Sequence, residues 1–367
     1  MRQTYRLDTT TIALEVFDVG SGTTVFSRRA ERLVAPASCM KLLTATTALS
    51  LLGTDHPYVT QVIGRGEQVG ATFQGDIVLQ LDDDPVLESL EPMVVAIRQH
   101  GIHRIEGNVV LDLMRSDTLK AHHTAATWDI PYNRLPVLLK GRERIESDLR
   151  YLFQMQGITL SHSHFANPER RTSDERPTIR IYRHETPLTD VIAPMLIHSS
   201  NIKADALYGH IESVTNRQFA LNLSGSQFLQ AQAELIVRQL GGSDDGFVVN
   251  DGSGLSPDNR LSVHFLVQLL RYAWQHEDMR RVFIDEALAT PGHPVRRGSL
   301  LARMSDPVFR NKVFVKTGTL TTRALSSLAG YAQASDGRWL IFAVVNEDSP
   351  VMESRIFQDC LCRELVR

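Results

Sequence analysis

Three short segments carry side chains that could together cleave an acyl bond. The first is Ser38-Cys39-Met40-Lys41, which places a hydroxyl and an amine at positions i and i+3. Residues three apart share one face of a helix, so the amine can reach the hydroxyl. A serine becomes a strong nucleophile when a base takes its proton, and a lysine can be that base when burial or a nearby positive charge lowers its pKa. The segment predicts Ser38 as a nucleophile and Lys41 as its base.

The second segment overlaps another serine-x-x-lysine match, Ser200-Asn201-Ile202-Lys203, which shows how weak that pattern is by itself. Ser199 and Asn201 supply a hydroxyl and an amide two residues apart. They could relay a proton to a leaving amine and hold a substrate amide. Because serine and asparagine also favour helix N-termini, a polar helix cap is the competing interpretation.

The third segment is Lys316-Thr317-Gly318-Thr319, which follows an apolar strand predicted at 313–315. A lysine and a threonine on an edge strand can hold a carboxylate, and a glycine lets a substrate backbone approach closely. The N–H of Thr319 could stabilise an oxyanion. An ordinary strand end is the competing interpretation, but only six lysines occur in the chain, so two in such segments are a less common coincidence.

The elements around these segments predict one sheet with helices over it. A hairpin near each end of the chain, with helices between, can assemble into a single antiparallel sheet covered by helices. Apolar periodicity and turn residues delimit the elements. The expected elements are hairpins at 11–29 and 326–345, a helix after Pro36 that ends at Gly53, helices at 188–198 (interrupted by Pro194), 201–214, 227–240 and 262–276, and a terminal helix from about 352.

Residues 56–185 have a different pattern, with short strand-like runs, polar turns and helices predicted at 90–100 and 142–156. The length of 367 residues also suggests roughly two domains. We therefore predict a catalytic domain from 1–55 and 187–367, and a smaller inserted α/β domain at 56–186.

Composition excludes several other functions. The net charge of −3 gives no strong attraction to nucleic acid, and three irregularly spaced cysteines form neither a disulfide framework nor a zinc motif. The acidic run 82–84 lacks EF-hand spacing, so we interpret it as a solvated turn before Pro85. We expect no metal and no cofactor. Four histidines in polar loops are interpreted as surface residues rather than zinc ligands: His122, His123, His162 and His164.

The sequence offers no membrane segment. No stretch approaches the roughly 18 apolar residues of a membrane span, and the first residues lack the apolar core of a signal peptide. Either the chain is intracellular, or it is a mature form whose export signal is missing.

With all three segments in order, the chain resembles the class C low-molecular-mass penicillin-binding proteins of the D-alanyl-D-alanine carboxypeptidase/endopeptidase type (penicillin-binding protein 4 type, peptidase family S13). The combination of serine-x-x-lysine, a serine-x-asparagine triplet and lysine-threonine-glycine is typical of penicillin-binding proteins and related β-lactamases. The resemblance runs from about residue 11 to the end with one gap. The matching segments are 35–53, 75–87, 101–112, the Trp128-Asp129 region, 199–211, 251–256 (DGSGLS), 293–304 and 313–331.

The resemblance implies a β-lactamase/transpeptidase-like sandwich, an antiparallel sheet covered by helices, with an inserted α/β domain. It implies that the penultimate D-alanine of a cell-wall peptide acylates Ser38 and that the N–H groups of Ser38 and Thr319 form the oxyanion hole. The implied catalytic residues are Ser38, Lys41, Ser199, Asn201 and Lys316. The implied substrate-binding residues are Thr317, Gly318, Thr319, Thr321 and Asp129.

Some positions depart from the family pattern. The stretch from Trp128 to Ser199 is shorter than usual, so the inserted domain is predicted to be shortened. Pro257, with Arg260 nearby, stands where a basic residue often grips the peptide stem, and Thr321 stands where some members have glutamine. These changes affect the expected specificity for diaminopimelate and leave the acylation residues intact.

We thus expect a periplasmic or extracytoplasmic serine D,D-peptidase that acts on peptidoglycan stem peptides, as a carboxypeptidase, an endopeptidase or both. It would bind β-lactam antibiotics covalently and would not bind nucleic acid. Self-association and peripheral membrane attachment stay open. The alternatives are a β-lactamase or esterase, for which a deacylating E-x-x-L-N pattern is missing, and a non-catalytic wall-binding relative.

Overall fold

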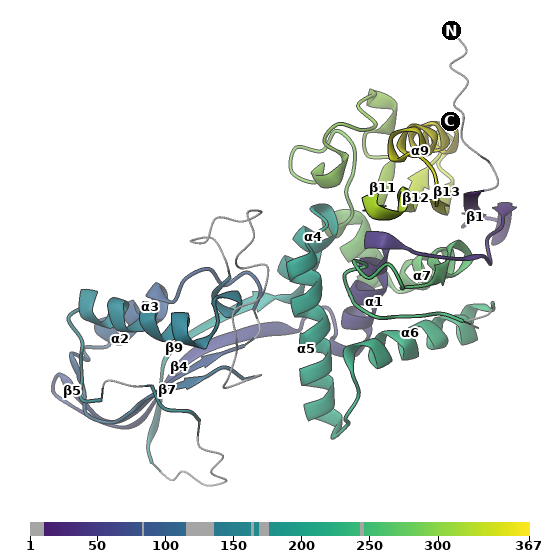
Figure 1. Cartoon of the computed structure of the whole chain (residues 1–367). Coiled ribbons are helices and arrows are strands. Elements are labelled where there is room, and N and C mark those ends of the chain that lie inside the picture. The colour runs from purple at the N-terminus through teal and green to yellow at the C-terminus, as the bar shows by residue number, and fades with distance from the viewer. Residues whose placement is uncertain (1–10, 83, 115–135, 163–164, 169–175, 243–245) are drawn as a thin grey trace. The chain divides into compact units, whose positions relative to one another are not determined.

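The computed structural model describes residues 11–82, 84–114, 136–162, 165–168, 176–242 and 246–367 (Figure 1). The chain divides into two compact units, one formed by Met1–Asp55 with Thr189–Arg367 and the other by His56–Leu188. Each unit combines helices with a sheet around its own buried residues. The α/β fold class predicted from the sequence is confirmed.

The first unit is built on an antiparallel sheet with strand order β11-β12-β13-β1-β2. Pairing of β1 with β13 joins the two predicted hairpins into this one sheet. The third chemical segment lies inside the edge strand, because that strand continues five residues beyond the predicted apolar run. The strands are β1 (Ile12–Asp18), β2 (Thr23–Arg28), β11 (Val313–Leu320), β12 (Leu325–Gln333) and β13 (Trp339–Asn346).

Helices cover both faces of this sheet, with α9 (Val351–Leu365) on one side and α7 (Val263–Gln275) on the other (Figure 1). Successive side chains of a strand point to opposite faces. Leu328 of β12 therefore packs in the cluster that contains Cys362 of α9, while Tyr331 of β12 donates its hydroxyl to the Leu270 carbonyl of α7 at 2.8 Å.

Helix α1 (Met40–Leu52) is buried on almost every side, from Met40 to Leu49. A helix that is apolar all round lies in the interior of a domain, so the expectation of a single apolar face was too narrow. A 3-10 turn, η2 (Ala37–Cys39), precedes it. Ser38 therefore lies in the turn just before the helix rather than within its first turn.

The helices between the hairpins follow the prediction closely, with one exception. Pro194 lies inside a continuous helix and does not interrupt it. Ser200 caps the next helix by accepting a hydrogen bond from the Lys203 backbone N–H at 3.3 Å. Besides short 3-10 turns, the other elements of this unit are α4 (Leu188–Ile197), α5 (Asn201–Phe219), α6 (Gly225–Leu240), α8 (Glu277–Arg281), a π-helical turn η6 (Val282–Ala287), and the paired short strands β3 (Leu33–Val34) and β10 (Leu261–Ser262).

The second unit carries a mixed sheet of order β8-β6-β5-β4-β9, with β7 paired to β5. The long β4 was not predicted, because its inward positions include Thr60, Gly64 and Gly66, which weaken the apolar alternation. Helices α2 and α3 pack on the sheet through Ile97 and Leu149. The elements are β4 (Pro57–Val69), β5 (Thr72–Leu81), β6 (Arg104–Ile105), β7 (Val109–Asp112), β8 (Thr159–Leu160), β9 (Thr178–Pro187), α2 (Glu91–Gln99) and α3 (Arg142–Met155).

Asp84 corrects the interpretation of the acidic run as a solvated turn. Its side chain is buried, and it accepts hydrogen bonds from the Thr186 hydroxyl at 2.5 Å and from the Val86 N–H at 2.8 Å. A buried carboxylate needs such partners to offset the loss of water. Asp84 therefore secures the turn that follows β5.

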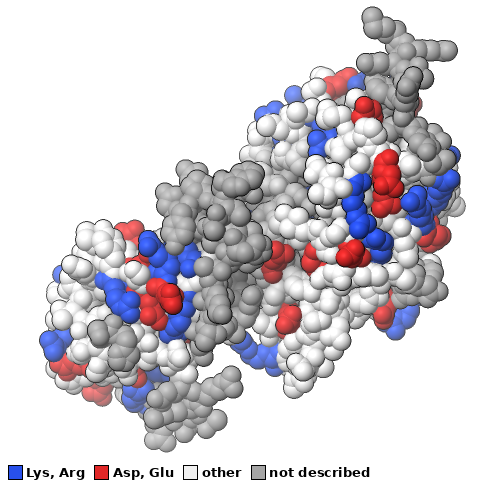
Figure 2. Space-filling view, viewed as in Figure 1, with Lys and Arg blue, Asp and Glu red and all other residues white. Residues whose placement is uncertain are grey.

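Within the described ranges, no helix is both long and apolar enough to cross a membrane. On the face drawn in Figure 2, acidic and basic side chains lie interspersed and form no large area of one sign. This distribution agrees with the net charge of −3.

Candidate active site

The structure brings the first two chemical segments together around the amine of Lys41. Its Nζ lies 3.0 Å from Ser38 Oγ, 2.8 Å from Asn201 Oδ1 and 2.5 Å from the Ser253 carbonyl oxygen. Lys41 is completely buried, whereas Ser38 and Asn201 are partly exposed. A hydroxyl open to solvent thus meets an amine that is shielded from it.

Burial and the positive charge of Lys316 lower the pKa of Lys41 to about 7. Both effects disfavour the ammonium form. Asp205 and Asp251 oppose them and keep the pKa from falling further. A substantial fraction of Lys41 is therefore neutral near pH 7, which a base for Ser38 requires.

The Ser253 carbonyl is held in place by the carboxylate of Asp251. Asp251 Oδ1 accepts hydrogen bonds from the N–H groups of Ser253 at 3.0 Å and Gly254 at 2.5 Å, and Oδ2 accepts one from Ser256 at 2.6 Å. Charge-assisted bonds of this kind are stronger than neutral ones. The loop at 251–254, which we predict to be structural, therefore also places the Ser253 carbonyl oxygen in the candidate site. A backbone oxygen is common to all residues, so the sequence could not reveal it.

Ser199 and Lys316 form a second hydrogen-bonded pair. Lys316 Nζ donates to Ser199 Oγ at 2.8 Å and to the Thr317 carbonyl at 2.6 Å. Burial lowers the pKa of Lys316 to about 8. Ser199 has a left-handed backbone with φ of 58°, a conformation that is uncommon for a residue with a Cβ. Ser200 caps α5, so the capping interpretation applies to Ser200, while its neighbours Ser199 and Asn201 contact Lys316 and Lys41.

The turn that carries Ser38 is tied to the edge strand β11. Cys39 Sγ contacts the Lys316 carbonyl oxygen at 3.5 Å, and Ser327 Oγ of β12 donates to the Pro36 carbonyl at 2.8 Å. Gly318 lies against this turn: a Cβ there would stand 2.2 Å from Ser327 Oγ and 3.0 Å from the Ser38 nitrogen. Only glycine allows this close approach.

The other predicted substrate-binding residues differ in how far they are exposed to solvent. Thr317 is almost buried, and Thr319 is partly exposed, with its Oγ1 accepting a hydrogen bond from Arg355 Nη2 of α9 at 3.0 Å. Thr321 is exposed in the 3-10 turn η9 (Thr321–Arg323) after β11. Asp129 lies outside the described residues. No sequence pattern indicated a role for Arg355, which lies on an ordinary amphipathic helix.

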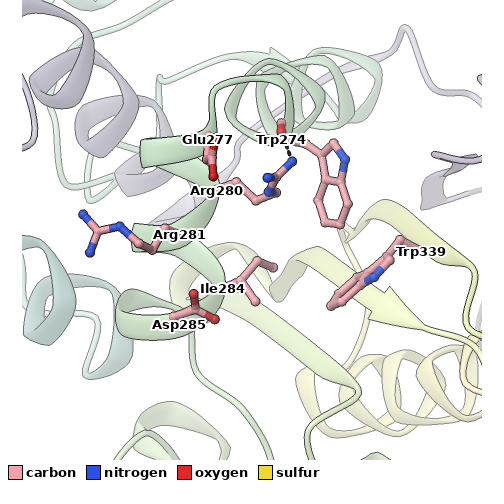
Figure 3. Close-up of a pocket in the computed structure, with 7 residues that line it drawn as sticks. All are labelled: Trp274, Glu277, Arg280, Arg281, Ile284, Asp285 and Trp339. Atoms are coloured by element: carbon pink, nitrogen blue, oxygen red, sulfur yellow. Dashed lines mark hydrogen bonds between the residues drawn. The ribbon is translucent and has the colours of Figure 1, made fainter.

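A pocket of about 410 Å³ lies elsewhere in the same unit, between α8, η6 and the start of β13 (Figure 3). None of the motif residues lines it. Arg280 stands over the Trp274 ring at 5.5 Å, so part of the aromatic surface is already covered. The lining residues are Trp274, Glu277, Arg280, Arg281, Ile284, Asp285 and Trp339.

A family model described as D-Ala-D-Ala carboxypeptidase 3 (S13) matches residues 1–134 and 143–360. The chain belongs to this family. The resemblance inferred from the three motifs is thereby confirmed, and the chain is an enzyme of the serine D-Ala-D-Ala carboxypeptidase group.

Individual relatives agree with this assignment. A D-alanyl-D-alanine carboxypeptidase of Actinomadura sp. (strain R39) is 24% identical over 90% of this chain and 76% of that protein. Penicillin-binding protein 4 from Haemophilus influenzae, solved in complex with a β-lactam, has a TM-score of 0.72 at 17% identity and covers 97% of this chain and 96% of its own. A predatory peptidoglycan endopeptidase from Bdellovibrio bacteriovorus has a TM-score of 0.62 at 13% identity, covering 96% and 90%. These similarities confirm the penicillin-binding-protein fold.

Proposed function

We propose that this enzyme is a serine D,D-peptidase that cleaves D-alanyl-D-alanine ends, D-alanyl-diaminopimelate cross-links, or both, through an acyl-enzyme on Ser38. The observation that carries the proposal is the 3.0 Å contact between partly exposed Ser38 Oγ and buried Lys41 Nζ. Amine and hydroxyl at this distance are within range for direct proton transfer.

In the proposed acylation step, neutral Lys41 accepts the Ser38 proton while Oγ attacks the carbonyl carbon of the penultimate D-alanine. The two N–H bonds of the neutral amine would donate to Asn201 Oδ1 and the Ser253 carbonyl. The lone pair is then left facing Ser38. The backbone N–H groups of Ser38 and Thr319 would stabilise the oxyanion that forms on the substrate.

Collapse of this intermediate requires a proton on the leaving amine. Ser199, hydrogen-bonded to Lys316, would donate its proton to that nitrogen and take one from the Lys316 ammonium. The C–N bond then breaks, the shortened peptide stays as an ester on Ser38, and the leaving residue departs as an amine. Water hydrolyses the ester, its hydroxyl joining the acyl group and its proton returning to Ser38 Oγ. Loss of a proton from Lys41 to solvent and uptake of one by Lys316 then restore the starting state.

The substrate-binding roles rest on positions in β11 and at the start of α5. Lys316 and Thr317, joined by Thr319, would hold the terminal carboxylate, and Gly318 would permit close approach of the peptide backbone. Asn201 of α5 would bind the peptide amide. Roles for Thr321 and Asp129 stay predictions that rest on the family resemblance.

The same acylation step would trap β-lactams, because their ring nitrogen stays attached after the amide opens and continues to block the site. The Haemophilus relative solved with a β-lactam supports this part of the proposal. Peptidoglycan lies outside the cytoplasm, so we propose a periplasmic or other extracytoplasmic location. Self-association and peripheral membrane attachment are not needed for the chemistry.

The proposal is tested by incubating the purified enzyme with muropeptides and identifying the products by mass spectrometry. Loss of a terminal D-alanine identifies carboxypeptidase action, and conversion of cross-linked dimers to monomers identifies endopeptidase action. Ser38→Ala should abolish both. Product formation at equal rates by the wild type and Ser38→Ala would overturn the proposal and favour a wall-binding relative. Rapid turnover of a chromogenic cephalosporin would favour a β-lactamase.

A further inference from the structure

The guanidinium of Arg355 contacts the outer end of the lysine-threonine-glycine segment. Arg355 Nη2 donates to Thr319 Oγ1 at 3.0 Å. Val313 and Val315 of β11 pack with α9 residues, and side chains two apart in a strand share a face. Thr317 and Thr319 therefore point to the α9 side, while Lys316 lies on the opposite face.

Among the described residues Arg355 forms no close ion pair: Asp359 attracts its charge only from beyond salt-bridge distance, and the nearby Arg303 opposes it. Asp359, one turn further along α9, pairs with Arg303 at 2.6 Å instead. Arg303 also donates to the Arg355 carbonyl at 3.3 Å, which secures the backbone at this position.

The lysine of this segment already has hydrogen-bond partners. Lys316 Nζ bonds to Ser199 Oγ and the Thr317 carbonyl. Thr317 and Thr319 lie on the opposite face of the strand from Lys316, and the guanidinium that reaches Thr319 there is that of Arg355. A cation that lies beside hydroxyl donors is a common arrangement for binding a carboxylate.

We propose that Arg355 is a positioning residue that gives this enzyme its selectivity for substrates with a free carboxylate on the leaving residue. By donating to Thr319 Oγ1, Arg355 directs the threonine O–H toward the carboxylate, and its charge favours the anion. This inference rests on the proposed function of the same site.

The experiment compares diacetyl-L-lysyl-D-alanyl-D-alanine with the same peptide carrying a C-terminal amide. Dissociation constants are measured by ligand-observed NMR on the Ser38→Ala enzyme, with and without Arg355→Gln, and kcat/KM is measured with Ser38 intact. Arg355→Gln should weaken binding of the acid peptide roughly 10- to 100-fold, the range for hydrogen bonds that involve charged groups, and leave the amide peptide unchanged. Arg355→Lys should restore part of the preference, because it keeps the charge without the planar fork.

The matched control is Arg363→Gln. It also removes a positive charge from α9, but Arg363 forms an ion pair with Asp306 at 2.8 Å. It should leave both peptides unaffected. Equal losses for acid and amide after Arg355→Gln, no loss for either, or no preference for the acid in the Ser38→Ala parent would overturn the inference. Acid preference that depends on Arg355 in an enzyme unable to hydrolyse the peptide would leave the inference standing and overturn the proposed function.

Discussion

Lys316 Nζ lies 2.8 Å from Ser199 Oγ, so an ammonium buried on the edge strand meets a hydroxyl held just before α5. Ser199 lies in the short connection between α4 and α5, and its backbone there is left-handed. Backbone strain of this kind costs on the order of 1–3 kcal/mol and persists where the surroundings enforce it. The role proposed for this pair is to move a proton to a substrate nitrogen, whereas the role proposed for Ser38 and Lys41 is formation of the acyl-enzyme.

If Ser199 delivers the leaving-group proton, its loss should matter most for poor leaving groups. Ser199→Ala should lower kcat/KM for an amide substrate ~100-fold or more, the range for a lost general acid. The corresponding thioester should lose much less, because a thiolate leaves without protonation. Ser200→Ala is the matched control: it removes a helix cap worth ~1 kcal/mol of stability and should leave both rates intact. Equal losses for the two substrates after Ser199→Ala would refute the assignment.

The two lysines predict a bell-shaped dependence of acylation rate on pH. Lys41 must be neutral to act as the base, so the rate should rise as pH increases through its pKa of about 7. Lys316 must be protonated to supply the leaving-group proton, so the rate should fall above its pKa of about 8. Because the charge of Lys316 affects the pKa of Lys41, the two apparent pKa values of the profile belong to the pair of lysines rather than to either residue alone. Stopped-flow acylation across this range measures them, and a rate that decreases steadily from pH 6 to 8 would contradict the role of Lys41.

Asp251 should tune the acid limb of that profile. Its charge raises the pKa of Lys41, so Asp251→Asn should lower this pKa and move the limb to lower pH. The rate at the optimum should also fall, because the loop that presents the Ser253 carbonyl loses its charged acceptor. Asp258→Asn changes an exposed carboxylate on the same loop, paired with Arg323 at 3.5 Å, and serves as the control. A shift of the limb to higher pH in Asp251→Asn would be inconsistent with the structure.

Gly318→Ala should separate β11 from the turn that carries Ser38. The added Cβ would stand 2.2 Å from Ser327 Oγ and 3.0 Å from the Ser38 nitrogen, so one of these groups must move. Misplacement by about 1 Å can cost ~100-fold in rate, and we expect acylation to slow by that order. Gly20→Ala, whose Cβ would meet nothing nearer than Asp18 Oδ1 at 3.3 Å, should react normally. Circular dichroism verifies folding, and an unchanged acylation rate in folded Gly318→Ala would rule out the close approach.

Much of the fold could be predicted because side-chain type and spacing encode it. The hairpins, the helices after Pro36 and at 201–214, and the terminal helix all carry clear periodicity or turn residues. Strand β4 was missed because Gly64 and Gly66 occupy buried positions, and a glycine gives no apolar signal. Gly64 fits there because a Cβ would come within 2.6 Å of the Phe73 ring.

The candidate site was only partly predictable. Its titrating and nucleophilic groups belong to recognisable residue types, so Ser38, Lys41 and Lys316 could be nominated. The Ser253 carbonyl could not, because every residue has a backbone oxygen and only the fold places this one at Lys41. Arg355 was missed because its contact with Thr319 joins residues 36 apart on a helix and a strand.

The most direct test of the site is the identity of the residue that a β-lactam acylates. The purified enzyme is incubated with benzylpenicillin, its intact mass is measured, and the modified peptide is located by tandem mass spectrometry. We predict one covalent adduct per chain, on Ser38, and none in Ser38→Ala. An adduct at another residue, or the absence of any adduct on the folded wild-type enzyme, would contradict the assignment of Ser38 as the nucleophile.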